Sequence, residues 1–494
     1  MTKQYRFLLA HLGGLLSISL VSVLFAKNLG DFPIFQWDEA RYVNNSLEIL
    51  SLGNWFHFTM DGTIDTWNFK PPLVLWLQAM SMKIVGINEL ALRLPSILAS
   101  LGVLILLYWF CVSALQSTLC GITSVLFFGA SCGFIGPHIG RTADLDAVQT
   151  FFVLWYTLYF LRYLLIGTPS KHLYPRLAVL VFLAFLCKGI PGLLLLPFLA
   201  LIAGFPRNFK KVYHNPSVYV YGILTVVMCS LYYLLREMNY PGYWELLKKS
   251  EFNRFSGEGI KWHVRPFDFY FKNFTDLKRY FFLLDFLPFT LITFLSARQR
   301  LIKQAYLYLL IITTAYFLFI SYPPVKLEWY DAPLYPFFAL LFGIFITETC
   351  KRMIPNKNWA AATAISCSLT LCIPHYRHIW EKIQYDQKKM EAVDDAEKGG
   401  LLMKQLQFDK PDEMEYTVLF GLKKIQHADQ IKFYQKAFAL RYGAKIQITD
   451  QLQHLTPGQK VLPANQSWSD SLHRYFPHTE TLWQSGQGKL LLIK

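Results

Sequence analysis

The sequence predicts a multi-pass α-helical membrane protein with a small soluble α/β domain at its C-terminal end. Apolar runs of roughly 17–22 residues recur from Phe7 to Pro374, and each is long enough as a helix to cross a hydrocarbon core of about 30 Å. Residues 375–494 contain no such run. The short loops between the runs are basic, which is typical of the cytoplasmic side of membrane proteins. We therefore expect a membrane domain over 1–374 and a soluble domain over 375–494.

The apolar runs predict eleven spans, within a range of about 11 to 13. The first run follows a basic segment but lacks a small-residue cleavage site, so we expect a retained anchor rather than a signal peptide. The run 71–86 is left out because it has sixteen residues and contains Lys83, which favours a juxtamembrane helix. The predicted spans are 7–26, 94–114, 119–137, 147–166, 176–187, 190–204, 216–235, 279–296, 304–321, 334–350 and 359–374.

The basic loops also predict the topology. With the N-terminus in the cytoplasm, the inner loops carry thirteen Lys and Arg and no Asp or Glu, as the positive-inside rule requires. An odd number of spans then places the C-terminal domain in the periplasm, and 27–93 and 236–278 become large periplasmic loops. The net charge of +15 lies mostly in short loops, so we expect membrane lipids and no nucleic acid as partners.

Acidic residues lie at two external positions. Asp38 and Glu39 open a helical pattern after the first span, and Asp144 and Asp146 follow the third. Two acids at a helix N-terminus can simply cap it, and acids beside Arg141 can form a structural ion pair. The alternative is functional, because ionisable groups at a membrane boundary are costly. Asp38 would then serve as general base for an acceptor hydroxyl or amine.

Cationic residues are predicted on the same side. Lys70 precedes two prolines at the start of 71–86, and Arg254 and Arg265 lie among aromatics in the second external loop. Such residues often only snorkel or form an interfacial belt. Lysine and arginine also bind phosphate, so the functional alternative is that they hold the phosphate of a lipid at this depth. His263 is either a metal ligand or an ordinary polar residue.

Two further segments carry charges. Lys188 lies in 187–192, where Gly and Pro interrupt a long apolar stretch, and such breaks are tolerated where the backbone lines a cavity. Lys326 and Tyr330 lie in a later external segment that a solvated loop would explain equally well.

Eight stretches, in this order, resemble the GT-C membrane glycosyltransferases of the aminoarabinose transferase and protein O-mannosyltransferase superfamily. They run through nearly all of the membrane domain. They are DEARY at 38–42, KPPL at 70–73, NELALRLPS at 88–96, RTADLDA at 141–147, LCKGIPGLLLLP at 186–197, NRF at 253–255, HVRPFDFY at 263–270 and KLEWYDAPLYP at 326–336. The resemblance implies a GT-C fold with juxtamembrane helices in the first external loop.

The resemblance also implies roles for individual residues. Asp38 would be the catalytic carboxylate, Asp146 a second acid of the site, and Lys70 with an arginine of the 254–265 loop the ligands of the carrier phosphate. We expect Glu39 as a further catalytic acid. Further phosphate ligands are expected at Arg41, Arg254, Arg265 and Arg141. The remaining expected site residues are Tyr42, Arg93, Asp144, Lys188, His263, Lys326 and Tyr330.

The implied activity is transfer of a sugar from a polyprenyl (undecaprenyl) phosphate carrier at the periplasmic face of a bacterial inner membrane. The acceptor, which is a lipid, a glycan or a protein, is left open. In aminoarabinose transferases an acid that helps bind a metal precedes the Lys-Pro pair, whereas here that residue is Phe69, so a divalent metal with His263 as a ligand stays open. The rival hypotheses are a non-enzymatic lipid or solute transporter and a scaffold that presents the C-terminal domain.

Overall fold

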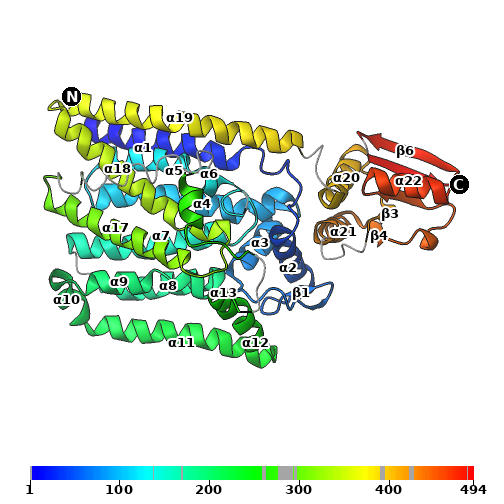
Figure 1. Cartoon of the computed structure of the whole chain (residues 1–494), viewed down its shortest axis with the longest axis horizontal. Coiled ribbons are helices and arrows are strands. Elements are labelled where there is room, and N and C mark those ends of the chain that lie inside the picture. Colours follow the sequence, from blue (N-terminus) through cyan, green and yellow to red (C-terminus); the bar gives the residue numbers. More distant parts are fainter. Residues whose placement is uncertain are drawn as a thin grey trace.

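The computed structural model shows a bundle of long helices with a sheet-containing unit at one end (Figure 1). The structure describes residues 3–136, 138–167, 171–258, 263–275, 293, 297–389, 395–421, 428–486 and 488–494. The predicted span 279–296 lies outside the described residues, apart from residue 293.

The bundle contains the apolar runs of the sequence as helices. The predicted span 119–137 is interrupted near Ser131, between the helices α5 (Thr118–Gly129) and α6 (Cys132–Ile135). The predicted span 190–204 is divided between the 3-10 helix η1 (Ile190–Leu193) and the helix α9 (Leu196–Ala203). The bundle helices are α1 (Lys3–Ala26), α4 (Glu89–Ser113), α5 (Thr118–Gly129), α6 (Cys132–Ile135), α7 (Asp146–Ile166), α8 (Leu173–Lys188), the 3-10 helix η1 (Ile190–Leu193), α9 (Leu196–Ala203), α10 (Pro206–Tyr213), α11 (Pro216–Asn239), α17 (Arg300–Ser321), α18 (Leu334–Met353) and α19 (Lys357–Lys389).

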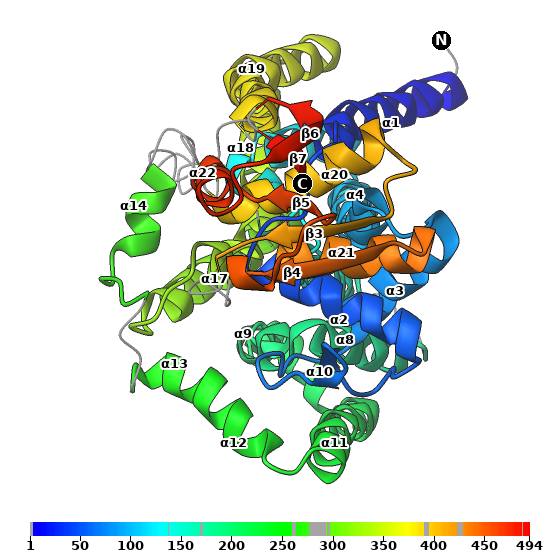
Figure 2. The ribbon, with the colours of Figure 1, turned by 90° about the vertical axis from the view of Figure 1, so that its right-hand side faces the viewer.

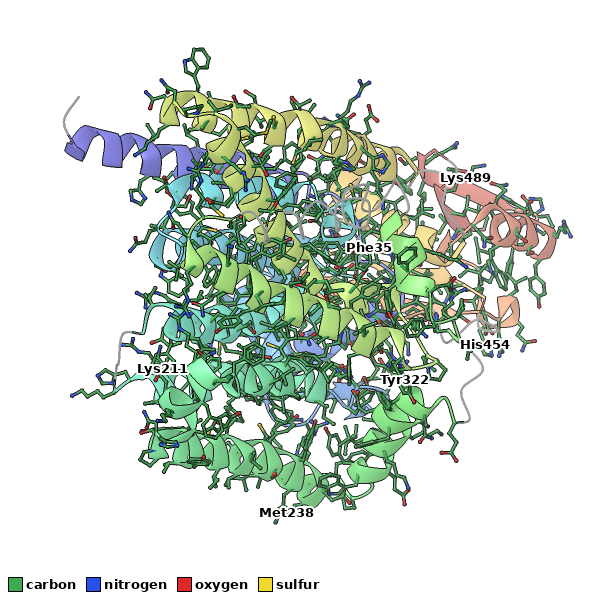
Figure 3. All side chains as sticks on the ribbon, turned by 60° about the vertical axis from the view of Figure 1, so that its left-hand side comes forward. Phe35, Lys211, Met238, Tyr322, His454 and Lys489 are labelled. Carbon is green, nitrogen blue, oxygen red and sulfur yellow. The ribbon has the colours of Figure 1, made fainter. Side chains whose placement is uncertain are left out.

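Several of these helices can cross a membrane. Among the described residues, five are long and apolar enough, namely α4, α7, α11, α17 and α18, and a sixth results if the bent segment from η1 to α10 is one span. The count of eleven stays a prediction. The outer face of α11 is apolar and exposed, with Met238 at the margin of the bundle (Figure 3), as expected for a surface that contacts lipid.

Helix α19 extends beyond the predicted end of the membrane domain. It continues through Pro374 to Lys389. The apolar composition ends near residue 374, but helical structure does not require an apolar sequence. The sequence pattern therefore marked where hydrophobicity ends rather than where the helix ends.

The two external loops fold differently. The first contains α2 (Asp38–Leu52), the short strands β1 (Thr59–Met60) and β2 (Thr63–Ile64), and α3 (Leu73–Val85), whose length is short for a span. Its position beside the membrane stays a prediction. The second contains α12 (Tyr243–Leu247), the π-helix η2 (Lys248–Phe252), α13 (Asn253–Ser256) and α14 (Phe269–Thr275).

The C-terminal unit is a five-stranded mixed sheet in the order β4-β3-β5-β7-β6, with three α-helices. Strand β3 is parallel to β4 and β5, while β7 is antiparallel to β5 and β6. Strands β6 and β7 pair as a hairpin at the end of the chain. The elements are α20 (Asp395–Asp409), β3 (Glu415–Leu419), α21 (Asp429–Tyr442), β4 (Lys445–Thr449), the 3-10 helix η5 (Leu452–His454), β5 (Lys460–Pro463), α22 (Gln466–Tyr475), β6 (Thr479–Ser485) and β7 (Gly488–Ile493).

The C-terminal unit is docked on the first external loop. Figure 2 shows α21 beside α2, and apolar residues of both helices, including Val43, Leu47 and Phe433, belong to one buried cluster. Asn44 donates a hydrogen bond of 2.7 Å to the carbonyl of Asp429, and the hydroxyl of Tyr434 donates one of 2.8 Å to Glu89. The last quarter of the chain therefore supports the helix that begins with Asp38.

Candidate active site

Asp38 is the first residue of α2, at the end of the bundle nearest the C-terminal unit. The preceding residue, Trp37, has φ 77° and ψ −122°, a left-handed conformation that is strained for a bulky side chain. The Asp38 side chain is half-buried. Burial raises the pKa of Asp38 to about 6, and the nearby negative charge of Asp144 adds to that increase. A partly desolvated carboxylate therefore lies directly after a strained backbone position.

A second carboxylate and a histidine lie beside Asp38. The ligand atoms of Asp38, His138 and Asp144 all lie within 4.8 Å of one another. His138 Nδ1 is 3.7 Å from Asp144 Oδ1, and the imidazole stacks on Trp329 with ring centroids 4.1 Å apart. Burial alone would lower the pKa of His138, but the carboxylate of Asp144 outweighs it, and the pKa is raised to about 9. His138 was not among the predicted site residues, because a single histidine in a short loop forms no recognisable sequence motif.

This cluster, rather than His263, is the arrangement suited to a metal. Two carboxylates and an imidazole are donors that Zn²⁺ and Mn²⁺ accept, and loss of the proton from His138 would free its nitrogen for a metal. His263 is exposed and does not belong to the cluster. Its backbone carbonyl accepts a hydrogen bond from the amide of Lys326. Of the two alternatives left open for His263, its exposed position therefore favours the ordinary polar residue over the metal ligand.

A cavity of about 240 Å³ lies next to the carboxylates and is lined by charged residues from four parts of the chain. Lys70 enters from the first external loop, Lys188 from the end of α8, and Arg254 from α13. Asp146, at the start of α7, accepts a hydrogen bond of 2.5 Å from Lys188 Nζ. Arg254 donates one of 3.4 Å to the hydroxyl of Tyr330. The sequence had named all five of these residues, and the structure brings them together.

The local backbone explains how Lys188 reaches this cavity. Helix α8 ends at Lys188 because Gly189 adopts φ 80°, and a side chain at Gly189 would lie 2.9 Å from the hydroxyl of Tyr233. The chain continues as η1, and Ile190 and Pro191 also line the cavity. The predicted break in the apolar stretch, and its place beside a cavity, are confirmed.

Glu251 is a further charged residue of the cavity that the sequence analysis missed. It lies in η2 and forms an ion pair with Lys70. Lys70 is held in place by its amide, which donates to Asn68 Oδ1, while Tyr243 donates to the carbonyl of Phe69. The alternative that Lys70 snorkels into solvent is therefore wrong, because its side chain is 10% exposed and ion-paired.

Tyr42 connects the two groups of charges. It lies one helical turn after Asp38 on α2, is buried, and its ring centroid is 5.5 Å from that of Trp67. Burial raises the pKa of Tyr42 well above its usual value, and the negative charge of Asp38 acts in the same direction. Asp38 itself interacts electrostatically with Lys188 and Asp146. The carboxylate cluster and the cationic cavity therefore form one continuous site.

Glu39 faces away from this site. Its two carboxylate oxygens accept four hydrogen bonds, two from Arg93 at 2.8 and 3.0 Å and two from the amides of Phe35 and Ala143 at 2.7 and 2.8 Å. Arg93 is 1% exposed and also donates to three carbonyls of 29–33. This buried network argues against Glu39 as a catalytic acid and against Arg93 as a residue that lines the site.

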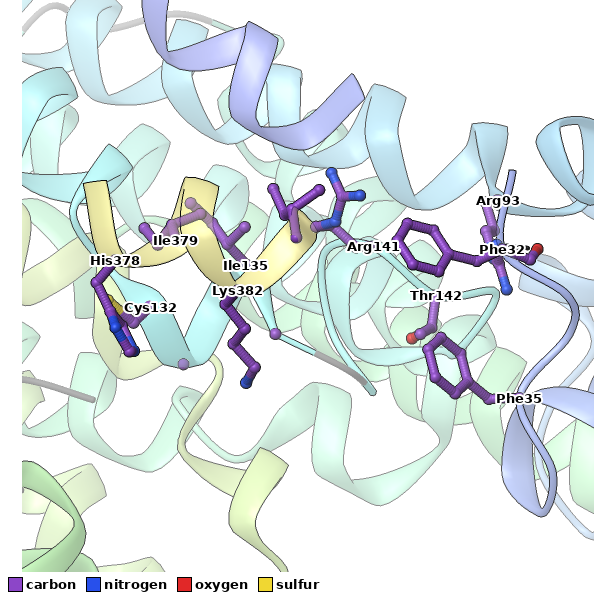
Figure 4. Close-up of a pocket in the computed structure, with 13 residues that line it drawn as sticks. Phe32, Phe35, Arg93, Cys132, Ile135, Arg141, Thr142, His378, Ile379 and Lys382 are labelled. Atoms are coloured by element: carbon purple, nitrogen blue, oxygen red, sulfur yellow. Dashed lines mark hydrogen bonds between the residues drawn. The ribbon is translucent and has the colours of Figure 1, made fainter. Parts of the chain in front are cut away.

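Arg141 is also structural. Its guanidinium donates to the carbonyls of Leu24, Phe25 and Lys27 at 2.6–3.2 Å, and so satisfies the orphan carbonyls at the C-terminus of α1. Figure 4 shows Arg141 in a separate pocket beside Phe32 and Lys382. Its guanidinium is engaged by carbonyl groups, which argues against the expected role as a phosphate ligand.

The other predicted cations also lie outside the cavity lining. Arg41 is 3.7 Å from Asp429 of the C-terminal unit and stacks on Trp67 at 4.6 Å. Arg265 is exposed and stacks on Phe269, and Lys326 Nζ donates to the carbonyl of Arg265 at 3.1 Å. The phosphate-binding role of Arg41 and Arg265 therefore stays a prediction that the cavity lining does not support, and Lys326 contacts a loop rather than the cavity.

An apolar cavity adjoins the charged one. It has a volume of about 600 Å³, lies among α7, α8, α9 and α11, and shares Ile190 with the charged cavity. Aromatic and aliphatic side chains such as Tyr156, Phe185 and Val226 line it. A molecule with a polar head and an apolar tail could therefore occupy both spaces at once.

Comparison with known proteins gives consistent results. The family described as dolichyl-phosphate-mannose-protein mannosyltransferase matches residues 69–233. An uncharacterized protein of Aquifex aeolicus (strain VF5) is 26% identical over 72% of this chain and 69% of its own length. An undecaprenyl phosphate-alpha-4-amino-4-deoxy-L-arabinose arabinosyl transferase of Pseudomonas savastanoi pv. phaseolicola (strain 1448A / Race 6) is 26% identical over 68% of this chain and 61% of its own length.

A solved structure extends the likeness to the whole fold. The crystal structure of ArnT from Cupriavidus metallidurans bound to undecaprenyl phosphate superposes with a TM-score of 0.63 over 97% of each chain, at 14% sequence identity. Because the aligned region of the Pseudomonas enzyme is less than two thirds of its length, sequence similarity covers only part of that protein.

Proposed function

We propose that the chain is an ArnT-like glycosyltransferase of the GT-C type, which transfers a sugar from a polyprenyl-phosphate carrier to an acceptor at the periplasmic face of the inner membrane. The observation that carries the proposal is the convergence of Lys70, Lys188 and Arg254 in one cavity beside Asp38. The comparisons do not favour the alternative of a non-enzymatic transporter.

The cations hold the phosphate of the carrier. Lys70 and Arg254 enter the cavity from the two external loops, so a phosphate between them would be bound from opposite sides. Cations fixed in a partly desolvated cavity stabilise the negative charge that develops on a departing phosphate. The apolar cavity beside it accommodates the first part of the carrier chain.

Asp38 acts on the acceptor. The acceptor oxygen or nitrogen forms a bond to the anomeric carbon while the bond from that carbon to the phosphate oxygen breaks, and its electron pair stays on the phosphate. The acceptor proton passes to the Asp38 carboxylate. The products are the glycosylated acceptor and the polyprenyl phosphate, whose phosphate has gained one negative charge. Asp146 holds Lys188 through their ion pair.

A metal is compatible with the same site. Asp38, His138 and Asp144 would hold it, and a bound divalent ion would supply positive charge close to the acceptor group.

We further propose the predicted topology. The N-terminus lies in the cytoplasm, the eleven predicted spans cross the membrane, and the domain after residue 374 lies in the periplasm. Its contacts with the first external loop support this placement, because α2 and α21 must lie on the same side of the membrane.

The test compares bacteria with and without the chain by mass spectrometry of lipids, surface glycans and exported proteins. We expect one class of molecule to lose a constant sugar mass in the deletion strain. Wild-type protein should restore it, whereas Asp38→Asn should lower transfer by about 10²–10⁴-fold, since it removes a general base. The Asp38→Asn protein should reach the membrane in normal amounts. Restoration of wild-type modification by Asp38→Asn would remove Asp38 from the mechanism.

A further inference from the structure

Glu251 is a charged residue of the cavity to which the proposed reaction gives no part. Its side chain is 17% exposed, and its carboxylate lies against the ammonium of Lys70. A phosphate bound by Lys70 must approach the same ammonium group. Carboxylate and phosphate oxygens are interchangeable partners for a lysine, so the two anions compete for one position.

This competition sets the net charge of the cavity, which differs by one unit with and without Glu251. Among the described lining residues, Lys188 forms an ion pair with Asp146 and Lys70 with Glu251, while Arg254 donates a hydrogen bond to the hydroxyl of Tyr330. The cavity therefore has a surplus of one positive charge with Glu251 in place and of two when Glu251 is displaced. A sugar-linked phosphodiester carries one negative charge, whereas a phosphate monoester carries about 1.5–2 near neutral pH.

The segment that carries Glu251 is suited to a change of position. It is a five-residue π-helix between α12 and α13, and such π-helical turns are rare and occur frequently at functional sites. None of its five residues is buried, and Phe252 is 57% exposed, so little packing holds the segment. Lys70, by contrast, is fixed by the contacts of Asn68 and Phe69 with their neighbours. Glu251 is therefore the partner that moves.

We propose that Glu251 is a resident counterion of the phosphate site, which the carrier phosphate displaces from Lys70 and which returns to Lys70 when the spent carrier leaves. This inference rests on the proposed function, because it requires a lipid phosphate in the cavity. Glu251 keeps Lys70 paired while the site is free. It also lowers the affinity for the more highly charged product, so that the product is released.

The experiment measures binding of undecaprenyl phosphate to purified full-length protein in detergent. Glu251→Gln keeps the size of the side chain but removes the competing charge, so we expect the dissociation constant to fall by at least about 10-fold, or 1.4 kcal/mol. Glu251→Asp should bind with an intermediate affinity. Glu245→Gln is the matched control, since Glu245 is an exposed residue of α12 outside the cavity lining, and it should bind like the wild type.

The outcomes separate this inference from the proposed donor. Equal binding by wild type and Glu251→Gln, or weaker binding by Glu251→Gln, would overturn the inference alone. Absence of binding to every variant would overturn the donor class and the inference with it. Thermal unfolding is measured in parallel, and failure of both Glu251 variants to fold would assign the Lys70–Glu251 pair a structural role and also overturn the inference.

Discussion

The two external loops contribute to the same site but are built in opposite ways. The first loop, which supplies Asp38 and Lys70, is held by buried polar contacts on several sides: Glu39 to Arg93, Asn45 to Asn68, and Ser46 to Gln78. The second loop, which supplies Glu251 and Arg254, forms short helical segments, and the described contact of its Arg254 side chain is a hydrogen bond of 3.4 Å. The comparison indicates a rigid platform for the reacting carboxylate and an adaptable element for the phosphate.

The largest effect on stability is expected from the buried Glu39–Arg93 ion pair, which holds the first loop. Glu39→Gln leaves the guanidinium of Arg93 buried without a counter-charge, and loss of one partner of a buried ion pair costs about 3–5 kcal/mol. We expect a large fall in the unfolding midpoint of the detergent-solubilised protein. Glu381→Gln is the control, because the Arg377–Glu381 pair is exposed to solvent and should contribute little to stability. Similar midpoints for both variants would contradict the structural role of Glu39.

The next largest effect is expected from the hydrogen bonds that join the C-terminal unit to the first loop. The Tyr434 hydroxyl accepts a hydrogen bond from the amide of Ile34 and donates one to Glu89, so Tyr434→Phe leaves two buried groups without that partner. We expect a loss of about 1–3 kcal/mol. Hydrogen exchange in α2 should increase at the same time, and α11, which has no part in this interface, provides the internal control. Unchanged exchange in α2 would show that the C-terminal unit covers the loop without stabilising it.

The smallest effect on stability is expected in the second loop. Arg254→Gln removes a partly exposed guanidinium with one long hydrogen bond, so the unfolding free energy should change by less than about 1 kcal/mol. Binding of undecaprenyl phosphate should nevertheless weaken, since a hydrogen bond to a charged group contributes about 1.5–3 kcal/mol. Arg265→Gln, which alters an exposed arginine of the same loop outside the cavity, should bind normally. A large loss of stability in Arg254→Gln would contradict the inference that the second loop is less rigidly held than the first.

The parts of the site that could be predicted from the sequence are those with a recognisable local setting. Asp38 begins an amphipathic helix, Lys70 precedes two prolines, and Lys188 interrupts an apolar stretch, and all three lie at the site. Each is a charged residue whose position in the chain is costly to maintain.

The errors concern which way a side chain points. Glu39 follows Asp38 directly, but consecutive residues of a helix are about 100° apart, so one carboxylate faces the site and the other faces Arg93. Arg141 lies close to Asp144 in the chain, yet its partners are carbonyl groups of α1. His138 and Glu251 were missed because their importance depends on contacts with Asp144 and Lys70, which are set by tertiary structure.

The docking of α21 on α2 has a consequence for biogenesis. The backbone of Ile34 and the side chain of Asn44 are bonded to residues 385–400 positions later in the chain. Under the proposed topology, the first external loop is exported before those partners are synthesised, so these contacts can form only after the final segment has been translated and translocated. Competence for the reaction would thus be acquired only at the last step of insertion, and an incomplete translation product could not act on carrier lipids.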